Sequence, residues 1–468
     1  MTPLAAILAA ALLAPPEPSV ASVARDVSIV RSEGSSRVEF TVSWPNSWRN
    51  ERNHDAAWIV LRGPDARRGP LRLASTGHAA TGKIEAAIET SDDGLGVFVS
   101  PESSHRGDVE WRLSLALAEE APESVTPWCV GMVFIPGGAF ELGDDDPIAL
   151  RFGAFHRVDE KGAAAGPLRI ESEAEVRVGA GRGALAYRVD EDGYRGDGKG
   201  PIPAAFPKGT RPFYVMKHEL TQGAYAAFLN ALPAEWRKRR ATLDLKGEEI
   251  ETCSIALDGD RFVARAPERP CNFVSWDDTC ALSDWLALRP ITEFEFEKAA
   301  RGPKRPMPGD YPWGTASRDD FARHVQASRD LAASGAAAEA ALSDARRAHL
   351  GASFYWVMDL AGSVWERVVS AGHPAGRAFR GTHGDGVLSK YGLATNEDWP
   401  KTAADGSTAP GVGYRGGVEY WKPATKDDPT NPQSPTALRT YAGWGGAERY
   451  KTYSARAGRS APSASAAD

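Results

Sequence analysis

The sequence predicts an α+β protein in which a small all-β domain precedes a larger mixed domain. Two observations support this prediction. Residues 25–125 contain short runs of alternating apolar and polar residues separated by turn residues, whereas residues 221–301 contain apolar stripes at helical spacing, each preceded by a capping residue. With 468 residues, 42% of them hydrophobic, the chain is long enough to fill two or three separate cores.

The first residues predict a secretory signal over residues 1–24. Leu4 to Leu13 form an apolar run that is too short to span a bilayer, and Ser22-Val23-Ala24 supply small residues for a cleavage site. No Lys or Arg precedes the run, so an apolar N-terminal strand or tail is the alternative. We therefore expect a secreted or periplasmic protein. Because no later stretch approaches about 18 apolar residues, we expect no membrane span.

Residues 25–125 are expected to form a β-sandwich, in which two sheets bury their apolar faces against each other. The clearest strand is marked by alternate apolar side chains, namely Val38, Phe40, Val42 and Trp44. The same signal returns at residues 57–61, 96–99 and 111–117. Trp44 and Trp48 could present flat indole faces to a sugar, but tryptophan is usually buried, which favours a place in the sandwich core.

The larger domain is expected to span residues 126–460, after a boundary rich in Glu, Pro and Ser. Residues 147–208 are rich in Gly, Ala and charge, and they predict a loop-rich insertion. Residues 325–349 are rich in Ala and predict a helix. Residues 461–468 are small and polar, so we expect a disordered tail.

Three helices of the larger domain are predicted from their caps. The first follows Thr221, and the second opens at Asp277 or Asp278. The third begins at Thr292, where Glu295 stands at the spacing of a capping box. All three are structural signals and carry no information about activity.

Charge and cysteine content exclude some classes of function. The formal net charge is −7 and no stripe of Lys and Arg is visible, so we expect no nucleic-acid partner. The four cysteines form no Cys-x-x-Cys pair, which argues against a zinc site. They are compatible either with two disulfides, in any of three connectivities, or with buried thiols. These residues are Cys129, Cys253, Cys271 and Cys280.

Six short motifs occur in a fixed order along the larger domain. They lie at residues 133–138, 213–221, 274–278, 292–302, 311–314 and 359–366, and the last reads Asp-Leu-Ala-Gly-Ser-Val-Trp-Glu. Together they resemble the formylglycine-generating enzyme family, also called the sulfatase-modifying factor family, over about residues 130–460. The resemblance implies a fold related to C-type lectins, poor in regular secondary structure, in which calcium ions hold loops in place.

The resemblance implies one calcium site at the last motif. Its ligands would be the side chains of Asp359 and Glu366 and the backbone carbonyls of Gly362 and Val364, all hard oxygen donors of the kind that calcium takes. The alternative is that Asp359 caps a turn and Glu366 pairs with a nearby or C-terminal arginine. We expect a second calcium site of the family to be lost, because Arg323 stands at a ligand position and a guanidinium cannot bind a cation.

Catalysis is where the sequence departs from the family. The oxidases that it resembles bind copper(I) through two thiolates near the C-terminus, but the last cysteine of this chain is Cys280. Aligning Gly416-Gly417 with the family's Gly-Gly step places Trp421 and Lys426 at the thiol positions. Neither side chain replaces a thiolate, so we expect no copper.

The polar groups that remain for a ligand groove are His383, Asp385, Glu419 and Trp421. His383 and Asp385 could exchange protons, although a glycine-spaced loop whose side chains bond the backbone is the favoured interpretation. The sequence thus favours an exported, calcium-stabilised pseudoenzyme that acts as a binding or scaffold module for a protein, peptide or glycan. The alternatives are an oxidoreductase with a cysteine-free groove and a functional formylglycine-generating enzyme.

Overall fold

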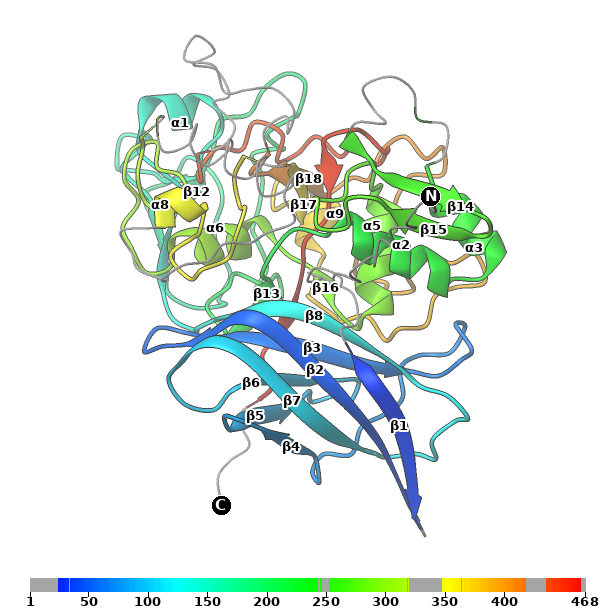
Figure 1. Ribbon diagram of the computed structural model, residues 1–468. Helices are drawn as coiled ribbons and strands as arrows, with labels where there is room; N and C mark the ends of the chain where they lie inside the picture. The colour runs from blue at the N-terminus through cyan, green and yellow to red at the C-terminus, as the bar shows by residue number, and fades with distance from the viewer. Residues whose placement is uncertain are drawn as a thin grey trace, which may run out of the picture.

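The computed structural model describes residues 24–32, 34–242, 245, 252–317, 319, 347–362, 364–417 and 435–463. Figure 1 shows layers of sheet at one end of the molecule and the helices gathered with long loops at the other. The predicted mixture of helix and sheet is confirmed. Residues 1–23 and 464–468, and with them nearly all of the expected signal and most of the expected tail, lie outside the described residues.

An antiparallel sheet of seven strands, counted over the described residues, runs through the molecule. Its order is β16 (Arg289–Pro290), β20 (Ala457–Ser460), β13 (Phe213–Met216), β8 (Thr126–Ile135), β3 (Asp55–Arg62), β6 (Val97–Pro101) and β5 (Ala86–Thr90). Three of these strands end before residue 126, and four begin at or after it. One continuous sheet therefore crosses the position where the sequence changes in composition.

A second sheet of four described strands packs on one face of the first. Its order is β1 (Arg25–Ser32), β2 (Ser35–Arg49), β7 (His105–Leu117) and β4 (Ala79–Gly82). Val38, Phe40 and Val42 of β2 share one buried cluster with Ile59 of β3 and Val99 of β6. The strands expected at residues 57–61, 96–99 and 111–117 are confirmed.

The two tryptophans of β2 take different environments because the strand bulges between them. A register shift lies between Trp44 and Ser47, and the extra residue turns the following side chains to the opposite face. Trp44 is half-buried beside Trp111, and its Nε1 donates to Asp55 Oδ2 at 3.2 Å. Trp48 is 1% exposed but packs in a separate cluster with Phe296, so the prediction that it lies in the sandwich core is wrong.

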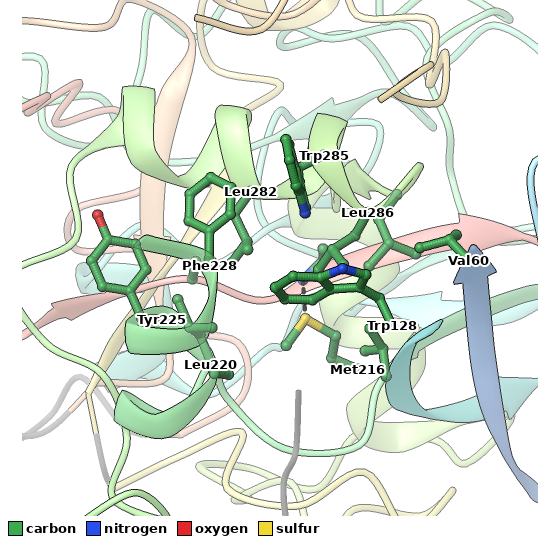
Figure 2. Packing of buried hydrophobic residues seen from close by; sticks show 14 of the residues in the cluster. Val60, Trp128, Met216, Leu220, Tyr225, Phe228, Leu282, Trp285 and Leu286 are labelled. Atoms are coloured by element: carbon green, nitrogen blue, oxygen red, sulfur yellow. Dashed lines mark hydrogen bonds between the residues drawn. The ribbon is translucent and has the colours of Figure 1, made fainter. Parts of the chain in front are cut away.

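The other face of the large sheet is covered by helices. Every residue of β3 is buried, because Ala57, Ile59 and Leu61 face the four-stranded sheet while Trp58 and Val60 face the helices. Figure 2 shows Val60 and Trp128 from the sheet in the same cluster as Phe228, Leu282 and Trp285 from the helices. This cluster joins strands that are buried on both faces to the amphipathic helices above them.

Two of the predicted helix starts are confirmed, and one is displaced. Helix α2 (Gln222–Ala231) begins after Thr221, and α6 (Glu293–Arg301) has the capping box of Thr292 and Glu295. Helix α5 (Trp276–Trp285) is capped by Ser275, not by an aspartate, so the predicted start at Asp277 or Asp278 is wrong. Asp278 instead completes a capping box, since its carboxylate accepts from the Ser275 N–H.

The remaining described elements are short. They are α1 (Pro147–Arg151), α3 (Ala234–Arg240), α8 (Arg347–Leu350), α9 (Pro374–Arg377), the pairs β9 (Phe140–Leu142) with β11 (Leu168–Ile170), β10 (His156–Arg157) with β12 (Leu185–Ala186) and β14 (Ile255–Asp258) with β15 (Arg261–Ala264), and the sheet β18 (Val412–Arg415), β17 (Trp365–Val369), β19 (Tyr453–Ser454). Most of the Ala-rich stretch at 325–349 lies outside the described residues. Within the described ranges, no helix combines the length and apolar character that crossing a bilayer requires.

Candidate functional site

The carboxylate of Glu366 is held by an arginine. Glu366 lies in β17, immediately after the loop that contains Asp359, and both Glu366 and Arg456 are fully buried. Arg456 donates from Nε and Nη2 to the two carboxylate oxygens of Glu366, at 2.8 and 2.7 Å. The same guanidinium donates to the carbonyls of Met216 and Met358. This bidentate ion pair matches the alternative given in the sequence analysis, in which Glu366 pairs with an arginine near the C-terminus.

Two backbone N–H groups anchor the loop before β17. Asp359 and Gly362 have φ angles of 58° and 99°, in the left-handed region that glycine adopts most easily. The N–H of Gly362 donates to the Gly416 carbonyl at 3.0 Å, and the N–H of Val364 donates to Glu219 Oε1 at 3.3 Å. The sequence places Glu219 in the motif at 213–221, but no local pattern predicts that its side chain meets this loop.

The expected calcium ligands are all oxygen donors, which suits that ion. Among the described residues, no three His, Cys, Asp or Glu side chains form a metal-binding group. That finding concerns side chains alone. Two of the four expected ligands are backbone carbonyls, those of Gly362 and Val364. Glu366 could join Asp359 at a calcium ion only by sharing its oxygens with Arg456. The calcium site formed by these four residues therefore stays a prediction.

His383 and Asp385 make separate contacts with the backbone. The Nε2 of half-buried His383 accepts from the Ser460 N–H at 3.0 Å, and exposed Asp385 accepts from the Val387 N–H at 2.8 Å. Burial lowers the pKa of His383 well below its usual value, and the cations Arg459 and Arg289 lower it further. The ring is thus neutral near pH 7 and serves as an acceptor for the last strand.

A group of one buried and three half-buried aromatic side chains lies beside the Gly416-Gly417 step. Trp365 packs edge to face on Tyr441, with ring centroids 5.5 Å apart, and Tyr441 contacts Trp444 at 5.8 Å. Tyr194, from the loop-rich stretch at 147–208, contacts Trp444 at 4.4 Å. We call these four residues the aromatic cluster.

Gly417 lies directly against this cluster. A Cβ at Gly417 would lie 2.4 Å from ring atoms of Trp365, so only glycine allows this approach. Two of the residues that we expected in a ligand groove, Glu419 and Trp421, follow this step. Both lie outside the described residues, as does Lys426.

The acidic residues of α6 are used for structure. Glu293 accepts from Arg439 at 2.6 and 3.0 Å and from Arg415 at 3.1 Å, and all three side chains are fully buried. Burial alone would raise the pKa of Glu293, but the guanidinium groups of Arg439 and Arg415 outweigh burial and lower that pKa. Glu297 accepts from Arg415 and from Arg301 in the same way. Both carboxylates are held in buried ion pairs with arginine, so they are poor candidates for acid–base chemistry.

All four cysteines belong to the described part of the chain, and each is a buried free thiol. Burial raises the pKa of Cys129 to about 12 and raises the pKa values of Cys253, Cys271 and Cys280. Because the thiolate is the form that binds metals and attacks substrates, these residues are unreactive near neutral pH.

A comparison with models of protein families matches residues 117–420 to the sulfatase-modifying factor enzyme 1-like domain. The matched range begins at Leu117, the last residue of β7, and it includes all six motifs of the sequence analysis. A comparison with curated proteins gives no match.

Proposed function

Because the chain belongs to the sulfatase-modifying factor family, we propose that it is an exported member of that family that binds a ligand without performing the family's copper oxidase chemistry. The supporting observation is the placement of sulfur. The two positions that align with the family's thiols are Trp421 and Lys426, and the four cysteines present are buried thiols with raised pKa values. Copper(I) prefers soft thiolate ligands, and burial with raised pKa values keeps these four residues in the thiol form.

The ligand would contact the aromatic cluster. Tyr194, Tyr441 and Trp444 are each partly exposed, and Trp365 beneath them is fixed by Gly417 and by Tyr414. Aromatic side chains offer a large contact area at a small cost in conformational entropy, and they dominate the energetics of binding surfaces. The cluster borders the segment that carries the thiols in the enzymes of the family. In this protein, a binding surface that includes the aromatic cluster would thus take the place of the family's two reactive thiols.

The proposal extends to the fold. The four-stranded and seven-stranded sheets share a buried cluster, which supports a β-sandwich arrangement for residues 25–125. The short strands and long loops after residue 136 are in keeping with a body like that of the C-type lectins. Calcium would be held by Asp359, Glu366 and the carbonyls of Gly362 and Val364, and it would fix the loop that precedes Trp365.

A direct test is to measure copper and substrate chemistry on the purified protein. Copper(I) is titrated in competition with a chromogenic chelator, and a cysteine-containing peptide is incubated with the protein and followed by mass spectrometry. We expect no copper retained against the chelator and no loss of the peptide thiol. Tight retention of copper(I), or conversion of the peptide cysteine to an aldehyde, would overturn the proposal and favour one of the enzymatic alternatives.

A matched variant makes the negative result informative. The double substitution Trp421→Cys with Lys426→Cys restores sulfur at the two aligned positions, and we expect it to retain copper(I) where the natural sequence does not. The control is Glu171→Cys with Lys199→Cys, which adds two thiols at exposed positions of the loop-rich stretch. If the control variant binds as much copper(I) as the Trp421→Cys, Lys426→Cys variant, then Trp421 and Lys426 do not occupy the positions of the family's thiols.

A further inference from the structure

The side chain of Gln222 joins two segments that each carry a cysteine. Gln222 is fully buried at the start of α2, and its Nε2 donates to the carbonyl of Thr252 at 2.8 Å and to the carbonyl of Pro270 at 3.2 Å. These two carbonyl oxygens therefore lie within about 6 Å of each other. Thr252 and Pro270 immediately precede Cys253 and Cys271.

A second contact holds the same segments together on the other side of the cysteines. Asn272 donates from Nδ2 to the Thr252 hydroxyl at 3.0 Å, and the N–H and hydroxyl of Ser254 both donate to Gln222 Oε1. Thr252 and Asn272 are thus hydrogen-bonded directly across the two segments, and Gln222 bridges Thr252 and Ser254 to Pro270. A disulfide needs Cα atoms about 4.4–6.8 Å apart. The charge of a Cys253 thiolate raises the pKa of Cys271, so these two side chains, held between the same hydrogen bonds, lie close enough to interact.

We propose that Cys253 and Cys271 form a disulfide when the protein folds in the presence of a disulfide oxidant, and that Cys129 and Cys280 stay as thiols. The other two cysteines have no such relationship. Cys129 lies in the cluster between the two sheets, whereas Cys280 lies in a different cluster with Trp276 and Phe294. The structure thereby selects one pairing from those that the sequence left open, and the inference does not depend on the proposed binding function.

The reaction is a thiol–disulfide exchange with a small-molecule disulfide such as oxidised glutathione. The thiolate of one cysteine attacks the oxidant and releases one molecule of small thiol, and the second cysteine then attacks the mixed disulfide and releases another. The Sγ–Sγ bond forms, both cysteine protons end on the released thiols, and two electrons reduce the oxidant. Burial raises the pKa of Cys271, and the charge of a Cys253 thiolate raises it further, so exchange is slow once the protein is folded.

The test uses the unmodified chain, refolded from the reduced and denatured state in a glutathione buffer. Free thiols are alkylated, and the protein is digested with trypsin without reduction and examined by mass spectrometry. Arg261 and Arg265 lie between the two cysteines, so Cys253 and Cys271 fall in separate peptides. We expect most molecules to yield these two peptides joined, with Cys129 alkylated. Cys280 shares its tryptic peptide with Cys271, so fragmentation of the joined peptides should place the alkyl group on Cys280 and the bond on Cys271. Alkylation of both Cys253 and Cys271, or a different pairing, overturns the proposal.

Thermal melts of the oxidised and reduced protein give a second readout. Because the bond closes a loop of fewer than 20 residues, we expect oxidation to raise Tm by a few degrees, roughly 3–5 °C. The double variant Cys253→Ala with Cys271→Ala should lose this difference, whereas Cys280→Ala, which removes an equally buried thiol, should keep it. An oxidation-dependent shift that survives in the double variant would also contradict the pairing.

Discussion

Arg459 and Asp93 join the last described strand to a turn of the N-terminal region. Arg459, in β20, donates to both carboxylate oxygens of Asp93 at 2.6 Å, across 366 residues of sequence. The guanidinium is 2% exposed and lies over the ring of Trp58, 4.5 Å from its centroid. A buried, stacked and doubly hydrogen-bonded arginine fixes the relative position of two distant segments.

Removal of Asp93 should destabilise the protein. Asp93→Ala leaves the buried Arg459 without its carboxylate, and we expect a loss of about 2–3 kcal/mol in the free energy of unfolding, less than for a fully buried pair because Asp93 itself is 35% exposed. Urea denaturation measures the loss. Asp92→Ala is the control, since Asp92 is exposed, and it should cost less than about 1 kcal/mol. Equal effects of the two variants would contradict the role given to Arg459.

The neutral state of His383 should make stability sensitive to acid. Its folded-state pKa is lowered, so below about pH 6.5 the unfolded chain binds a proton that the folded protein excludes. The contribution of His383 is fully present above pH 6.5 and is lost as pH falls, by up to about 1.4 kcal/mol per pH unit until the lowered pKa is reached. His383→Gln should flatten the pH dependence of unfolding between pH 6.5 and 5. An unchanged slope would show that the ring does not exclude the proton.

The buried pairing of Glu293 should be essential to the larger domain. Glu293→Gln removes one charge between Arg439 and Arg415, and we expect it to cost about 3–5 kcal/mol. The loss is measured by chemical denaturation followed by circular dichroism. Glu171→Gln is the matched control, because Glu171 pairs with Arg169 at an exposed position and should contribute less than about 1 kcal/mol.

The close approach of Gly417 to Trp365 predicts a steric effect. Gly417→Ala would place a methyl group 2.4 Å from the indole, and we expect a loss of about 1–3 kcal/mol together with a change in tryptophan fluorescence. Gly131→Ala in β8 is the control, because no atom outside its immediate chain neighbours lies within 4 Å of the added Cβ. The control variant should be as stable as the natural protein or slightly more stable.

The calcium proposal predicts a change in melting temperature on chelation. We expect EGTA to lower Tm by several degrees and added calcium to restore it. Asp359→Asn keeps a residue type that tolerates the φ of 58°, so its effect reports the loss of a carboxylate ligand and not backbone strain. This variant should melt at a lower temperature and should respond little to EGTA. A natural protein with the same Tm in calcium and in EGTA would remove the proposed site.

Local signals predicted local structure well. The capping box of Thr292 and Glu295 fixes the start of α6 because both partners lie within four residues of each other, and the alternation of Val38, Phe40 and Val42 fixes the buried face of β2. The start of α5 differs from the prediction because aspartate is also a good cap, although Ser275 and Asp278 stand at the same capping-box spacing as Thr292 and Glu295.

Long-range relationships could not be predicted in the same way. No pattern in the sequence connects Glu366 with Arg456, although an arginine partner could be anticipated from the difficulty of burying a carboxylate alone. The bulge in β2 is also invisible in the residue pattern, and it moved Trp48 to the opposite face. The position of Tyr194 in the aromatic cluster depends on how a stretch rich in glycine folds back, which periodicity does not encode.

The position of β20 in the large sheet has a consequence for biosynthesis. This strand lies between β16 and β13, yet its residues are made long after theirs. Until residue 460 has left the ribosome, the growing chain holds a gap between β13 and the edge strand β16, and the backbone donors and acceptors of β13 are open to pairing with another molecule. We expect nascent chains that stall before this point to need a chaperone, and those that pass it to close the gap in a single late step.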